Sequence, residues 1–351
     1  MIDFRQNLIS HSTTILDAMR QLDAVPGTLT LFVLDDEGRM VGTLTDGDIR
    51  RGLIAGLGLQ GLVKDFMTTK YRSLANDAFS VHAFKAARDF GIRLLPELDE
   101  QGCITRVHDL KRKRSNLPLE CVIMAGGRGE RLRPLTDDMP KPMLPLGSKP
   151  ILEHNIDNLV SYGVEKIYIS VRYLGQQIVD HFGDGSSKGI EIEYIWEDEP
   201  LGTAGALSLI KSIGSEYLIL MNSDLLTDVD FEELYLQVID RQADVGVASV
   251  THTVKVPYGI FEEENQQIYG LKEKPVFTNY ANAGIYILKS ELISRVPKDT
   301  FYDITDLMDV LISEKRLLIH NPIYGYWIDI GQHQDYENAQ EIMKHLDKSS
   351  E

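Results

Sequence analysis

The stretch that decides the fold is Leu119-Glu-Cys-Val-Ile-Met-Ala-Gly-Gly-Arg-Gly-Glu-Arg-Leu-Arg-Pro134. Residues 119–124 form a mostly apolar run with the length of a buried strand, and glycines follow at once. At the carboxyl edge of a doubly wound sheet, glycine lets backbone amides approach phosphate oxygens. No Gly-Lys-Ser/Thr follows, so this is not a Walker loop, and it does not match the dinucleotide fingerprint. The sequence therefore predicts a phosphate-binding loop of another kind.

The charged residues of this loop are mainly basic. Arg128, Arg131 and Arg133 lie within it, and Lys141 follows shortly afterwards. An arginine can bind two phosphate oxygens at once, and a lysine acts as a point charge, so together they offset repulsion toward an incoming anion. We predict Arg131 and Lys141 to be the catalytic cations.

Downstream, strands alternate with helices, which is typical of a mostly parallel sheet covered on both faces. Strands are expected at 119–124, 166–171, 190–196 and 217–221, and helices at 151–162, 175–182 and 203–213. Closer-spaced strands at 244–251, 259–263, 268–273 and 281–288 indicate an antiparallel addition that forms a lid or sugar wall. The predicted fold class is α/β, with a Rossmann-like mixed sheet.

Upstream, the basic segment 111–118 ends in proline and is typical of an exposed connection, so a domain boundary is expected near residue 115. Before it, one pattern occurs twice. The first copy has a helix at 14–22, strands at 29–34 and 40–44 and a turn at 35–38; the second has a helix at 78–90, strands at 93–98 and 103–107 and a turn at 99–102. We predict a domain at 1–113, with repeats 1–60 and 61–113, and a second domain at 118–348.

Bulk properties narrow the function. The chain has 351 residues with 43% hydrophobic and 25% charged content, which is ordinary globular composition. A net charge of -17 argues against binding to nucleic acid or anionic membranes. Cys103 and Cys121 have no metal-ligand spacing and indicate neither a disulfide framework nor a zinc site. The N-terminus has no signal-peptide core, so a cytoplasmic location is expected.

The segments 126–136 and 140–145 closely resemble the signature of the sugar-1-phosphate nucleotidyltransferases, which make nucleotide sugars, and the likeness extends over 119–345. The resemblance implies a glycosyltransferase-A-like domain that transfers a nucleoside monophosphate from a triphosphate to a sugar 1-phosphate. The nucleotide-binding residues that it implies are Met124, Ala125, Gly126, Gly127, Gly129, Glu197, Gly202 and Thr203.

Glu197 is expected to select the base, because it stands where relatives that use uridine or thymidine nucleotides present a glutamine. An ionised carboxylate only accepts hydrogen bonds, and guanine offers two neighbouring donors. GTP is therefore the substrate that we expect. UTP or dTTP with glucose 1-phosphate is the alternative, because the reader could instead be Glu199.

The resemblance also implies a metal and a sugar site. Asp224, after a buried strand, and Asp329 are the expected ligands of Mg²⁺, which prefers oxygen ligands; a lone aspartate would otherwise be a turn residue. Asp224 is thus catalytic together with Arg131 and Lys141. The sugar-binding residues implied by the family are Tyr258, Gly259, Glu273, Lys274 and Asn282, with an exposed ion pair as the alternative for Glu273 and Lys274.

The duplicated N-terminal pattern resembles a pair of cystathionine-beta-synthase-type (CBS) repeats, which often bind an adenine nucleotide. Thr45 and Asp48 match the ribose-binding pair, whereas Arg106 replaces the hydroxyl residue before Asp109 in the second repeat. The alternative is that Thr45 and Asp48 cap a helix that begins at Asp48. Such repeats usually associate face to face, so a homo-oligomer is expected.

Fusion of these repeats to a nucleotidyltransferase resembles enzymes that supply GDP-linked hexosamine, mannose or heptose for bacterial surface glycans, and GDP-glucosamine is the first guess. A hypothesis of another class is a catalytically idle nucleotide sensor. The complete set of acidic and basic residues argues against that hypothesis.

Overall fold

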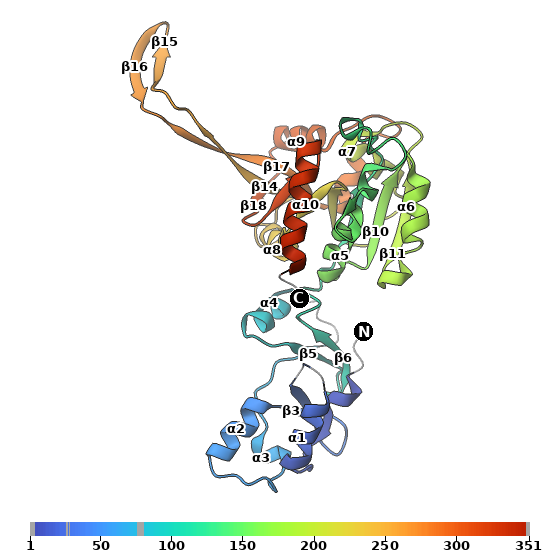
Figure 1. The fold of residues 1–351 in the computed structure, drawn as a ribbon, viewed down its shortest axis with the longest axis vertical. Coiled ribbons are helices and arrows are strands. Elements are labelled where there is room, and N and C mark those ends of the chain that lie inside the picture. The colour runs from blue at the N-terminus through green and yellow to red at the C-terminus, as the bar shows by residue number, and fades with distance from the viewer. Residues whose placement is uncertain (1–3, 26, 28, 76–80, 349–351) are drawn as a thin grey trace. The chain divides into compact units, whose positions relative to one another are not determined.

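The computed structural model describes residues 4–25, 27, 29–75 and 81–348 (Figure 1). The chain divides into two compact units, Met1–Asn116 and Leu117–Glu351. Within the described residues, no helix is both long and apolar enough to cross a membrane.

The first unit contains two small sheets of the same design. One has the order β1 (Leu8–Ser10), β2 (Thr30–Leu34), β3 (Met40–Thr45), and the other β4 (Leu74–Ala75), β5 (Leu94–Leu98), β6 (Ile104–Asp109). In each, the first pair of strands is parallel and the second pair antiparallel. The helices are α1 (Ile15–Ala24), α2 (Asp46–Ile54), α3 (Val63–Phe66) and α4 (Val81–Asp89). Residues 78–80 of the expected second-repeat helix lie outside the described residues.

Thr45 and Asp48 form a capping box at the start of α2, which begins at Asp46 rather than at Asp48. The Thr45 hydroxyl accepts from the Asp48 amide at 3.3 Å, and the Asp48 carboxylate accepts from the Thr45 amide at 2.9 Å. Thr68 and Arg51 also donate to Asp48. Burial by itself raises the pKa of Asp48, but these hydrogen bonds outweigh it and hold the pKa below its usual value. The capping role is therefore present in the structure.

The second unit is built on a seven-stranded sheet with the order β11-β10-β7-β12-β17-β14-β18. Its strands are β7 (Glu120–Met124), β10 (Lys166–Val171), β11 (Glu191–Trp196), β12 (Tyr217–Asn222), β14 (Val245–Lys255), β17 (Val276–Lys289) and β18 (Leu318–Pro322). The first four are parallel neighbours, and β17 runs antiparallel between β12 and β14. The fold is thus the mixed α/β sheet that the sequence predicts.

Helices and short strands complete this unit. The helices are α5 (Ile151–Ser161), α6 (Gly175–Phe182), α7 (Gly202–Gly205), α8 (Phe231–Asp240), α9 (Ile304–Ser313) and α10 (His333–Lys348); the short strand pairs are β8 (Pro145–Leu146) with β9 (Lys149–Pro150) and β13 (Leu225–Thr227) with β19 (Trp327–Asp329). A core of buried aliphatic side chains, including Val122, Leu218 and Leu288, joins the sheet to α9.

The helix expected at 203–213 is wrong in length. The structure has the single turn α7, then a 3-10 turn at Ala206–Leu209, and an extended backbone from Ile210. The Ala204 and Gly205 amides both donate to the Tyr302 carbonyl, at 3.0 and 2.9 Å. The first amides of a helix have no acceptor within it, so this distant carbonyl caps the start of α7.

Strands β14 and β17 are longer than expected and leave the sheet as a two-stranded ribbon. Their tip carries a separate two-stranded sheet of β15 (Ile260–Glu264) and β16 (Gln267–Lys272). Figure 1 shows this ribbon projecting from the second unit. We call residues 250–282 the arm and the rest of the second unit the body.

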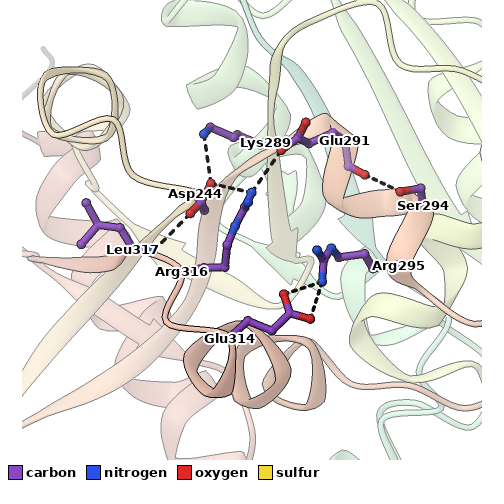
Figure 2. A network of polar contacts seen from close by, with 8 residues as sticks. All are labelled: Asp244, Lys289, Glu291, Ser294, Arg295, Glu314, Arg316 and Leu317. Atoms are coloured by element: carbon purple, nitrogen blue, oxygen red, sulfur yellow. Dashed lines mark hydrogen bonds and ion pairs between the residues drawn. The ribbon is translucent and has the colours of Figure 1, made fainter.

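A polar network links β14, β17 and the residues before β18 (Figure 2). Asp244 accepts from Lys289 at 3.0 Å, from Arg316 at 2.9 Å and from the Leu317 amide at 3.1 Å. It therefore joins the start of β14 to the end of β17 and to the residues before β18. Burial alone raises the pKa of Asp244, but the cationic and amide donors outweigh it, and the pKa lies below its usual value.

We expect Asp244→Asn to lower the free energy of unfolding by about 2 kcal/mol at pH 7, because two cations lose their common partner. A carboxyl group whose pKa is lowered by folding stabilises the fold above its unfolded pKa of about 3.9. This stabilisation is lost as the pH falls toward the pKa of the folded state. The deficit should therefore shrink between pH 5 and pH 3 in thermal unfolding curves. The control is Glu314→Gln, which breaks the ion pair between Glu314 and Arg295. This pair is more exposed than those of Asp244, so its loss should cost less than about 1 kcal/mol. An equal loss in both variants would contradict the role of Asp244.

Candidate active site

A pocket of about 500 Å³ opens where β7 and β12 end. Carboxyl ends of parallel strands meet at one edge, which is where open α/β sheets bind ligands. Among the predicted residues, those that line the pocket are Met124, Gly126, Gly127, Gly129, Arg131, Lys141, Glu197, Gly202, Thr203 and Asp224. Ala125 is buried beside them and does not line the pocket. All three predicted catalytic residues therefore meet at one cavity.

Several pocket residues were not expected from the sequence. They are Glu130, Pro142, Arg172, Pro200, Leu201, Asn222, Ser223 and Phe301. Arg172 follows β10 directly, and Asn222 and Ser223 lie at the end of β12, so strand position was the signal that could have identified them. Phe301 comes from a distant loop, and no local pattern marks it.

The glycine loop is shaped by close approaches. At Gly129 the backbone has φ +62°, and a Cβ there would lie 3.0 Å from Lys141 Cβ. The Thr136 hydroxyl donates to the Gly129 carbonyl at 2.9 Å and closes the loop. A Cβ on Gly126 would lie 2.9 Å from Glu197 Oε1, whereas one on Gly127 would meet open space. The loop thus lies tightly against the protein and leaves Gly127 open for a ligand.

The charges of the pocket gather at one corner. The ammonium of Lys141, a residue that is 8% exposed, donates to Asp224 Oδ2, while Asp224 Oδ1 is buried without a hydrogen-bond partner. β13 pairs with β19 so that Leu225 faces Asp329, and the Ile330 amide donates to the Asp224 carbonyl at 3.0 Å. The two aspartates are therefore neighbours although they are far apart in the sequence.

The electrostatics of Asp329 follow from that proximity. Loss of solvent, and then the charge of Asp224, raise the pKa of Asp329, while Lys141 and Arg131 lower it. Two carboxylates, one of which has a buried oxygen without a hydrogen-bond partner, fit a cation such as Mg²⁺. Among the described residues, no group of three or more acidic, histidine or cysteine side chains surrounds such a position. The remaining ligands would have to be phosphate oxygens and water.

Glu197 lies on the pocket wall and is 7% exposed. One carboxylate oxygen accepts from the Ser170 hydroxyl, and the other accepts from the Leu201 amide at 3.0 Å. A carboxylate has about four acceptor positions, so two remain for a ligand. Glu197 therefore orients the loop after β11 as well as facing the pocket.

Gly202 and Thr203 attach the start of α7 to the loop before α9. The Thr203 amide and hydroxyl donate to Asp303 at 2.9 and 3.1 Å, and the same hydroxyl accepts from the Ile304 amide at 2.9 Å. Gly202 has φ +79°, and a Cβ there would lie 2.8 Å from the Tyr302 carbonyl oxygen. These residues shape the pocket wall through their contacts with the rest of the chain.

The residues predicted to bind the sugar do not line the pocket of their own chain. Tyr258, Gly259, Glu273 and Lys274 lie on the arm, where a Cβ on Gly259 would be 3.0 Å from Glu273 Oε2. Asn282, at the base of the arm, donates to the Tyr286 hydroxyl at 2.7 Å and accepts from the Gly284 amide at 2.9 Å. The expected wall is therefore a projecting ribbon, because β14 and β17 stay paired with each other after they leave the sheet.

The mixed sheet, the glycine loop at its carboxyl edge and the corner of two aspartates with a lysine define an α/β protein built to bind a phosphorylated ligand. The chain belongs to the nucleotidyl transferase family, whose model matches residues 120–345. The CBS domain model matches residues 8–55.

Similar proteins point the same way. Mannose-1-phosphate guanylyltransferase catalytic subunit beta of Xenopus tropicalis is 32% identical over 226 residues, which are 62% of each chain. The alignment thus spans less than two thirds of that relative. A Bacillus anthracis protein assigned as a glucose-1-phosphate thymidylyltransferase superimposes with a TM-score of 0.54 at 25% identity, over 64% of this chain and 95% of that one. HddC of Yersinia pseudotuberculosis, complexed with GMP-PN, gives 0.50 at 28%, over 64% and 99%.

Proposed function

We propose that the chain transfers a nucleoside monophosphate from a nucleoside triphosphate to a sugar 1-phosphate. An oxygen of the sugar phosphate attacks the α-phosphorus, the bond from that phosphorus to the bridging oxygen breaks, and pyrophosphate leaves with its electron pair. The observation that carries this proposal is the meeting of the glycine loop, Arg131, Lys141 and Asp224 at one pocket.

The residues would act by position and charge. Arg131 and Lys141 neutralise the triphosphate, and backbone amides around Gly127 face its oxygens. Asp224 and Asp329 would hold Mg²⁺, which offsets the charge of the phosphates when it is bound. The attacking phosphate has a second pKa of about 6 and is already largely dianionic at neutral pH, so no general base is needed.

GTP is the proposed nucleotide, supported by the acceptor capacity of Glu197 and by the names of the guanylyltransferase relatives. UTP or dTTP with glucose 1-phosphate remains the second candidate, in line with the thymidylyltransferase-like structural neighbour. For the sugar we propose mannose, heptose or glucosamine 1-phosphate. The product would be a GDP-sugar for bacterial surface glycans, made in the cytoplasm where GTP is supplied.

Pyrophosphate release from a panel of nucleotides and sugar phosphates tests this proposal. We expect kcat/KM to be about a hundredfold higher with GTP than with UTP or dTTP, since two charge-assisted hydrogen bonds to guanine are at stake. Glu197→Gln should reduce this preference to less than about tenfold, and the matched variant Glu199→Gln should leave it intact. If Glu199→Gln alone moved the preference, the base would be read there. No pyrophosphate from any pair would favour an idle sensor.

For the first unit we propose adenine-nucleotide binding near Thr45 and Asp48, supported by the CBS match. Calorimetric titration of AMP into the whole protein should give a saturable heat that Asp48→Ala abolishes. Asp46→Ala, in the same first turn but exposed, should keep it. A flat titration of the wild type would leave Thr45 and Asp48 with their capping role alone.

A further inference from the structure

The arm exposes many large apolar side chains. Those with the greatest exposure are Tyr258 (73%), Tyr269 (71%), Phe261 and Leu271 (60% each), Val276 (56%) and Ile268 (55%). The tip strands β15 and β16 pair only with each other in the described sheets. Exposed apolar surface of this extent marks a contact with another molecule.

The boundary between the body and the arm is a bulge in β17. Val247 pairs with Tyr286 and Ser249 with Asn282, so the residues between them on β17 outnumber those on β14. Gly284 lies in the bulge with φ +72°, and a Cβ there would lie 2.6 Å from Asn222 Nδ2. On the body side the strands are buried, and on the arm side they are exposed. The bulge therefore sets the direction in which the arm leaves the body.

Beyond the bulge the ribbon is continuously paired, from Ser249 with Asn282 to Lys255 with Val276. The Val256 amide adds a hydrogen bond to the Pro275 carbonyl at 3.0 Å. At about 3.3 Å per residue, residues 251–264 can reach about 45 Å. Figure 1 shows the tip of this ribbon projecting from the body, and no arm residue is among those that line the pocket of its own chain.

We propose that the arm is exchanged between two copies of this chain and that its tip completes the partner's pocket. Each pocket holds the groups for the nucleotide, and each arm brings Tyr258, Glu273 and Lys274, which the pocket lacks. The proposal rests on the proposed function, because the family resemblance implies that these arm residues bind the sugar.

A second copy of the chain explains both the exposed arm and the pocket that lacks the arm residues. The arm exposes large apolar side chains, and Phe301, which lines the pocket, is itself 59% exposed. When two copies exchange their arms around a two-fold axis, each arm is covered and each pocket is completed. The assembly is then closed.

Co-expression of two inactive variants tests the exchange. Asp224→Asn damages the pocket and Glu273→Ala damages the arm, and each alone should be inactive. Random pairing makes half of the dimers mixed, and one of the two sites in each mixed dimer is intact, so about a quarter of the wild-type rate should return. The control pair Asp224→Asn with Arg131→Ala, both in the pocket, should return nothing. No recovery with the first pair would overturn the exchange.

A second readout does not depend on activity. In a Cys103→Ser background, Tyr258→Cys and Phe301→Cys chains are co-expressed and treated with a short bismaleimide; Cys121 is buried. A covalent dimer is expected from the mixture and from neither variant alone. The proposal would be overturned if the mixture gave no covalent dimer and a chain carrying both substitutions became cross-linked within itself. If the wild type released no pyrophosphate, the proposed function would be wrong, but the cross-linking experiment would still test the exchange of arms.

Discussion

Asp224→Asn is expected to lower kcat/KM by about a thousandfold, which corresponds to about 4 kcal/mol of lost transition-state stabilisation. The substitution keeps the shape of the side chain and removes its charge. Asp224 Oδ1, buried and unpartnered, would lose its ability to bind a cation strongly, and the buried ammonium of Lys141 would lose its counter-charge. The measurement is the initial rate of pyrophosphate release over a range of Mg²⁺ concentrations.

The matched control is Asp230→Asn. Asp230 is the exposed N-cap of α8, where its side chain accepts from the Glu233 amide, and asparagine caps as well as aspartate does. This variant should keep the wild-type rate. Thermal unfolding of both variants separates loss of chemistry from loss of fold. A wild-type rate in Asp224→Asn at every Mg²⁺ concentration would show that this carboxylate has no catalytic role.

Arg131→Ala is expected to lower kcat/KM about a hundredfold, or about 3 kcal/mol. Arg131 lines the pocket and is close enough to Asp329 to lower its pKa. Its guanidinium can bind two phosphate oxygens, so its removal leaves the developing charge of the departing pyrophosphate less neutralised. Single-turnover rates at saturating nucleotide distinguish this loss from weaker binding.

Arg133→Ala is the control for Arg131. It lies two residues further along, forms an exposed ion pair with Asp137 and does not line the pocket. We expect its rate to stay within about twofold of wild type, because exposed ion pairs contribute little. Arg131→Lys should recover part of the rate, since it restores charge without the bidentate geometry. Equal losses in Arg131→Ala and Arg133→Ala would remove the specific role of Arg131.

The pocket could be predicted because its residues directly follow strands. Met124 ends β7 and Asp224 follows β12, and the parallel pairing of these strands brings their carboxyl ends to one edge. The strand 166–171 and the helix 175–182 were predicted with their observed bounds for a similar reason, since their apolar spacing is a local property. The family resemblance added the roles of residues that spacing alone leaves ordinary.

Other features depend on partners that are distant in the sequence. The segment expected as a helix at 203–213 is a single turn, and the acceptor of its first amides is the Tyr302 carbonyl. Glu197 shares its carboxylate with Ser170 and Leu201, and Asp329 reaches Asp224 only through the pairing of β13 with β19. None of these contacts leaves a periodic signal near the residue concerned.

Local order along the chain thus determined the strand–loop–helix elements, the glycine loop and the position of Asp224, because backbone periodicity and strand ends act within a few residues. The direction of the arm was decided by tertiary structure. It follows from a register shift between two long strands and from the space beside Gly284, which Asn222 occupies. Register between strands is a non-local property, and a change at one bulge redirects every residue beyond it.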